Sequence, residues 1–217
     1  MKILALSGSP RGQKSQTRVL AEKVLEAARA KGAEVEFVDL AKARIGFCQA
    51  CEVCHQGPDC VLQDDGKAIL RKMLAADGLI LASPVYLNQV TAQMKALLDR
   101  TSHFIHCMRL MGRYAAAVTT SGGGGGADVQ QFLQNYGYLV GAQFVGGVDA
   151  RMPLKDADFN AAAALGEALV TAIRDGKIYP DQVQIIEERK RYFARLMAQR
   201  KEQWPYEYEY WRAQGWL

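Results

Sequence analysis

The sequence lacks any long apolar run, and no stretch of about 18 apolar residues is present that would cross a membrane. Its first residues carry too short an apolar segment for a secretory signal peptide, and no small-residue cleavage site follows. Charge of one sign is not in large excess either, since the net charge is +4 at pH 7. We therefore expect a cytoplasmic protein with neither a membrane partner nor a nucleic-acid partner.

Cysteine is scarce as well, with 5 in the chain, but all except Cys107 lie in one short segment. Two-residue spacings let neighbouring thiolates converge on one centre, as they do in loops that hold iron–sulfur clusters. Gly57 and Pro58 can turn the chain back after the third cysteine, so that the fourth completes the ligand set. The spacing is C-x2-C-x2-C-x5-C and predicts a [4Fe-4S] cluster on Cys48, Cys51, Cys54 and Cys60.

Other interpretations of this segment stay open at the level of sequence. The four cysteines could bind structural zinc, although zinc sites usually pair two C-x-x-C units across a longer spacer. A redox-active dithiol is the second alternative, and a disulfide framework is disfavoured in the cytoplasm. We expect His55 to be a solvent-exposed loop residue rather than a hydrogen-bond donor to a cluster. Cys107, which is near His103 and His106, is interpreted as a small buried residue rather than a metal ligand.

The turn after the first apolar run has the character of an anion site. Residues 2–7 predict a buried parallel strand, and apolar residues at helical spacing predict a helix that ends near Gly32. A helix N-terminus favours an anion, and hydroxyl and basic side chains add hydrogen bonds and charge. The turn is neither a G-x-G-x-x-G dinucleotide motif nor a P-loop. It suits a single terminal phosphate, as on FMN; the alternative is an ordinary N-cap. Its polar side chains are Ser9, Arg11, Lys14, Ser15 and Thr17.

Four further runs predict strands at residues 34–40, 78–83, 114–121 and 143–149, with helices at 66–76, 91–101, 127–141 and 158–174. Asp64 and Asp65 are interpreted as helix caps rather than as a metal-binding pair. Alternating strands and helices predict an α/β fold with a doubly wound parallel sheet of five strands in the order 2-1-3-4-5.

Ligands of such sheets bind at the carboxyl ends of the strands. After the third strand, Tyr86 and Asn88 offer a ring and an amide that suit a flat heteroaromatic ligand, and a packing role for Tyr86 is equally open. The glycine run at 122–126 follows the fourth strand and permits close backbone approach.

The C-terminal part differs in character and divides the chain. Residues 1–176 form the predicted FMN-binding domain with a cysteine loop at 44–62, and residues 177–217 form a helical and aromatic extension. The extension ends in a segment with all three tryptophans, which we expect to dock on its own domain or on a partner subunit. A charged amphipathic helix is predicted at 181–203, with an apolar face of Val183, Ile186, Tyr192, Phe193 and Leu196.

Three motifs together resemble the NADPH-dependent FMN reductase family of flavodoxin-like proteins. They are the segment from Gly8 to Thr17, the cysteine run followed by Asp64-Asp65, and the segment from Ala82 to Arg100. The four-cysteine motif is similar to that of the iron–sulfur flavoprotein branch. The resemblance covers residues 1–175, and Gln16 stands where the family often has asparagine.

The resemblance implies FMN at the strand carboxyl ends, a [4Fe-4S] cluster beside the flavin, and homodimers or homotetramers. It implies that one group of residues holds the phosphate, namely Ser9, Arg11, Ser15, Gln16 and Thr17. It implies that a second group lines the isoalloxazine, namely Pro84, Val85, Tyr86 and Asn88. It implies that a third group closes over the flavin, namely Ser121, Gly122, Gly123 and Gly124.

These expectations lead to an FMN-dependent oxidoreductase that passes electrons between FMN and the cluster. No catalytic acid–base residue is expected. The redox partner would be a ferredoxin-like protein, NAD(P)H or a small molecule. One alternative is an NAD(P)H-dependent FMN or quinone reductase whose cysteines bind zinc or no metal. Another is a non-enzymatic redox-sensing or interaction module.

Overall fold

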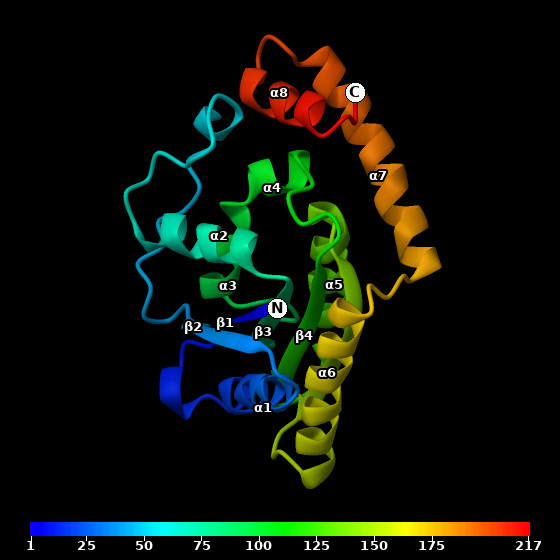
Figure 1. Cartoon of the computed structure of the whole chain (residues 1–217). Coiled ribbons are helices and arrows are strands. Elements are labelled where there is room, and N and C mark those ends of the chain that lie inside the picture. The colour runs from blue at the N-terminus through cyan, green and yellow to red at the C-terminus, as the bar shows by residue number, and fades with distance from the viewer.

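The computed structural model describes residues 1–217 and shows a five-stranded, all-parallel sheet (Figure 1). The strand order is β2-β1-β3-β4-β5, which confirms the predicted 2-1-3-4-5 topology. The strands are β1 (Lys2–Ser7), β2 (Glu34–Asp39), β3 (Gly78–Pro84), β4 (Tyr114–Ser121) and β5 (Gln143–Arg151).

Helices alternate with the strands and continue beyond the last one. They are α1 (Gln16–Ala30), α2 (Asp65–Ala75), α3 (Ala92–Asp99), α4 (Ser102–His106), α5 (Gly126–Val140), α6 (Asp156–Arg174), α7 (Pro180–Gln199) and α8 (Pro205–Ala213). Two single 3-10 turns, Gly12–Lys14 and Val53–His55, lie in the loops that follow β1 and β2. None of the helices combines the length and the apolar character needed to cross a membrane.

The central strands are buried on both faces, which explains why they read as continuous apolar runs. Successive side chains of a strand point to opposite faces. In β1, Ile3 and Ala5 therefore pack under α1 and α6, while Leu4 and Leu6 pack under the helices of the other face. That second core extends through α2, α3 and α5 to the tail helices.

The predicted helix at 91–101 is in fact two elements. Helix α3 ends at Asp99. The Thr101 hydroxyl donates to the Leu98 carbonyl at 2.6 Å, and it thereby takes an acceptor that the next backbone amide would use if the helix continued. Helix α4 then begins at Ser102. The break leaves Arg100 buried between α3 and α4, 3% exposed.

Helices α7 and α8 wrap back over the domain, as the orange and red ribbons in Figure 1 show. Trp211 is fully buried, and its Nε1 donates to the His106 carbonyl at 2.9 Å. Docking of the aromatic segment on its own domain is thereby confirmed. The prediction that Tyr192 lies on the apolar face of α7 is wrong, because this residue is 56% exposed. Met197, which was not predicted, is buried on that face instead. The imperfect apolar periodicity of this charged helix explains the error.

Candidate functional site

The first candidate site lies where β1 turns into α1. Ser15 is the N-cap of α1, and its hydroxyl accepts a hydrogen bond from the Arg18 amide at 3.1 Å. Ser9, Ser15 and Thr17 are all buried, and the Thr17 hydroxyl lies 2.6 Å from that of Thr120 at the end of β4. The turn therefore combines a helix cap with first-turn amides that lack intrahelical partners, an arrangement that suits an anion.

These side chains surround a cavity of about 220 Å³ at the carboxyl ends of β1, β3 and β4. Its lining includes a single charged side chain, the guanidinium of Arg11, and no carboxylate. The lining residues are Ser9, Arg11, Ser15, Gln16, Thr17, Pro84, Val85, Tyr86, Thr120, Ser121, Gly122 and Met152. Such a surface suits an anionic group at one end and an aromatic ring at the other.

Three of the residues expected here do not line the cavity: Asn88, Gly123 and Gly124. Asn88 instead faces the glycine loop, because a Cβ added at Gly125 would lie 2.6 Å from its Oδ1. The backbone amides of Val85 and Tyr86 donate to the carbonyls of Thr120 and Gln89, so they are not free for a ligand. Thr120 and Met152 also line the cavity and were not expected, because neither belongs to a local motif and only the three-dimensional packing brings them to the first turn.

The second candidate site is the cysteine loop. All four of its cysteines are free thiols and line one cavity of about 300 Å³, whereas Cys107 is fully buried elsewhere, as predicted. Ala50 and Glu52 have φ values of 50° and 59°, so left-handed backbone curls the loop around the cavity. Burial raises the pKa of the Cys54 thiol to about 11, and the Glu207 carboxylate adds to the effect. A metal that binds here must displace that proton.

Arg100 forms part of the wall of this cavity. Its side chain is 0% exposed, and its guanidinium donates to Asp64 Oδ2 at 2.8 Å and to the Gly46 carbonyl at 2.9 Å. Asp64 also accepts from the Gly66 amide and is the N-cap of α2, which agrees with the capping role expected for it. The Arg100 Nε–H has no hydrogen-bond partner. A buried cation with a spare donor therefore stands beside the thiols.

Residues 1–153 match the sequence profile of the NADPH-dependent FMN reductase family. The chain belongs to this family. Membership confirms the resemblance seen in the motifs, and the enzyme class that it implies is a flavin-dependent oxidoreductase.

An iron–sulfur flavoprotein of Methanocaldococcus jannaschii is one relative of this chain, and it is 39% identical over 54% of this chain. The chain spans 61% of that relative's length. An iron–sulfur flavoprotein of Archaeoglobus fulgidus is 28% identical over the full length of both chains. Among solved structures, a WrbA-like flavodoxin from Agrobacterium tumefaciens is 18% identical with a TM-score of 0.60, over 81% of this chain and 99% of the other. This structural likeness shows the flavodoxin-like fold.

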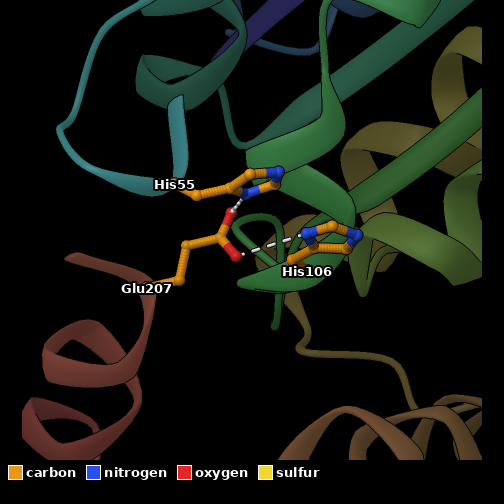
Figure 2. A group of neighbouring side chains, drawn as sticks. All are labelled: His55, His106 and Glu207. Atoms are coloured by element: carbon orange, nitrogen blue, oxygen red, sulfur yellow. Dashed lines mark hydrogen bonds and ion pairs between the residues drawn. The ribbon is translucent and has the colours of Figure 1, made fainter. Parts of the chain in front are cut away.

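A largely buried polar cluster joins the cysteine loop to α4 and α8 (Figure 2). His55, Glu207 and His106 offer three ligand-type atoms within 4.8 Å of one another. The expectation that His55 is exposed is wrong, because helix α8 covers it and leaves it 6% exposed. Burial by itself raises the pKa of Glu207, but hydrogen bonds with both histidines outweigh it and hold that pKa below its usual value.

Proposed function

We propose that this protein is an iron–sulfur flavoprotein that passes electrons between FMN and a [4Fe-4S] cluster. The observation that carries the proposal is the convergence of four unpaired cysteines on one cavity: Cys48, Cys51, Cys54 and Cys60. Four thiolates are the usual ligand set of such a cluster. The names of the relatives support the same function.

The hydroxyl-lined cavity fits the phosphate end of FMN. Ser9, Ser15 and Thr17 are buried hydroxyls beside a helix N-terminus, and Arg11 supplies positive charge. The lining contains no carboxylate that would repel a phosphate. Tyr86, 47% exposed, lies at the same cavity and offers a ring face to a flat ligand. We infer that the five phosphate-binding residues expected from sequence act here.

The cysteine-lined cavity fits a metal–sulfur centre in charge as well as in ligand type. Thiolates brought together repel one another, and the buried guanidinium of Arg100 offsets part of that negative charge. Its unpartnered Nε–H is available to a sulfur acceptor, and hydrogen bonds to sulfur are one way that a protein tunes such a centre.

When bound, FMN would take two electrons as a hydride or exchange them one at a time, and a cluster would exchange one, so the pair would convert between the two kinds of transfer. The protein's own residues bind and orient the cofactors. The lining of the hydroxyl-lined cavity contains no histidine, carboxylate, cysteine or lysine, in keeping with a role in electron transfer rather than acid–base catalysis. The electron donor would be NAD(P)H, a ferredoxin-like protein or a small molecule, and a homodimer or homotetramer remains our prediction.

Anaerobic purification followed by absorption spectroscopy and iron, sulfide and zinc assays tests the proposal. We expect flavin bands with about four iron and four sulfide per chain. Cys54→Ala should lose most of the iron, while the control Cys107→Ala should keep it, because Cys107 is buried away from the cavity. Flavin with zinc or without metal would instead indicate a simple FMN or quinone reductase. A colourless protein would contradict both.

A further inference from the structure

The tail helix α8 and the cysteine loop are joined through one buried carboxylate (Figure 2). The side chain of Glu207, on α8, is 0% exposed. Its Oε1 lies 2.9 Å from Nδ1 of His55, and its Oε2 lies 3.2 Å from Nδ1 of His106. His55 follows Cys54 directly and belongs to the 3-10 turn Val53–His55, while His106 ends α4. One side chain therefore bridges the cysteine loop and the domain.

Further contacts reinforce this bridge. The indole of Trp204 stacks on both imidazoles, with ring centroids 4.3 Å from His55 and 4.8 Å from His106. The Gln56 side chain donates to the Gln203 carbonyl, so a second loop residue is bonded to the segment just before α8. The turn Val53–Gln56 of the cysteine loop thus rests on the tail, while Asp59 further along the loop pairs with Lys67 and Arg71 of α2.

The burial of Glu207 makes the two elements depend on each other. A buried carboxylate is strongly unfavourable unless its oxygens accept hydrogen bonds. Each oxygen has one histidine donor, and one of those donors comes from the cysteine loop. If the loop opens, one oxygen loses its histidine donor; if α8 leaves, His55 loses its only side-chain hydrogen-bond partner and the indole of Trp204, and keeps only its stack on His106.

We propose that Glu207 is a positioning residue that holds the turn Val53–Gln56 of the cysteine loop, so that α8 must be seated for the cavity to keep a metal centre. The role of the cavity rests on the proposed function above, but the attachment of the loop does not. The contacts favour this role over a metal ion bound by the three side chains, because the two oxygens face different imidazoles at hydrogen-bonding distances.

Hydrogen exchange of the reduced, metal-free protein tests the attachment by itself. The amides of His55 and Gln56 donate to the carbonyls of Glu52 and Val53 at 2.9 Å, so they report on the turn. We expect Glu207→Gln to speed exchange of this segment about tenfold, because local opening no longer breaks a charged hydrogen bond. Glu209→Gln is the matched control on the same helix, since Glu209 is exposed and pairs with Arg212; it should change the rate less than about twofold.

Two further variants show whether Glu207 acts through His55. His55→Gln should speed exchange as Glu207→Gln does, and the double variant should add little, since both remove the His55–Glu207 hydrogen bond. Unchanged exchange in β4 shows that the fold is intact in each variant. If Glu207→Gln left the turn as protected as in the parent protein, or if the two changes added fully, the proposal would be wrong.

Metal retention supplies the second readout. Iron release to a chelator from the anaerobic holoprotein should be about tenfold faster for Glu207→Gln than for Glu209→Gln. A parent protein without iron would refute the proposed cluster and leave the exchange result standing; unchanged exchange in an iron-loaded protein would refute the attachment alone. Stoichiometric zinc binding by a variant with all four loop cysteines changed to serine, lost on Glu207→Gln, would overturn the proposal in favour of a separate metal site.

Discussion

Replacing Asp64 by asparagine removes the charge that balances the fully buried guanidinium of Arg100 in the wall of the cysteine-lined cavity. Asp64 receives two hydrogen bonds from Arg100, at 2.8 and 3.3 Å, and one from the Gly46 amide at 2.8 Å. Asparagine has one acceptor oxygen where aspartate has two, so its NH₂ group must face a donor. The variant therefore leaves a buried cation without its counter-charge, with the Gly46 carbonyl and one amide oxygen as its acceptors.

The expected cost follows from the burial. Removing one partner of a buried ion pair costs about 3–5 kcal/mol. Asparagine still caps α2 and keeps the side-chain shape, so we expect the lower end, about 3 kcal/mol. For a chain of this length, that corresponds to a fall in Tm of about 6–12 °C.

The assay is thermal or urea unfolding of the metal-free protein at pH 7, with Asp65→Asn as the control. Asp65 is the exposed neighbour whose carboxylate accepts from the Arg44 amide at 2.7 Å, so its replacement should cost about 1 kcal/mol or less. Equal effects of the two substitutions would refute the argument, because they would show that burial of the ion pair is energetically irrelevant.

The same ion pair has a pH signature. Burial alone raises the pKa of Asp64, but hydrogen bonds from Arg100 and the Gly46 amide outweigh it and hold that pKa below the usual value. A carboxyl group with a lowered folded-state pKa contributes its full stability above its unfolded pKa, about 3.9, and loses it as pH falls through the folded pKa. The stability difference between the parent protein and Asp64→Asn should be constant near neutral pH and shrink below about pH 4.

Two other substitutions follow from close contacts elsewhere. Gly166→Ala in α6 would place a Cβ 2.2 Å from the Val24 carbonyl oxygen of α1, so the free energy of unfolding in urea should fall by about 2 kcal/mol. Gly137→Ala in α5 meets nothing closer than 3.6 Å, so the free energy of unfolding should rise by about 1 kcal/mol. Equal effects of the two substitutions would contradict the packing at Gly166. Thr17→Val removes a hydroxyl from the first cavity and leaves that of Thr120 unpaired, so the Kd for FMN, followed by flavin fluorescence, should rise about tenfold, and an unchanged Kd would place the phosphate elsewhere.

Much of the fold and part of each site could be read from local patterns. Apolar runs such as residues 2–7 predict buried strands because every side chain of a central parallel strand is covered. The alternation of strands and helices then restricts the topology to a few arrangements, and the observed order is the one expected. Cysteines two residues apart lie in one loop whatever surrounds them, so their convergence on one cavity was also within reach of the sequence.

The tertiary structure alone decided which distant residues complete the sites. Thr17 and Thr120 are 103 residues apart, Asp64 and Arg100 are 36 apart, and Glu207 lies 152 residues from His55. No local spacing predicts such pairs, because a side chain's burial depends on what packs over it. His55 reads as a polar loop residue until α8 covers it, and the cost of burying Glu207 is met only by donors that folding brings from elsewhere in the chain.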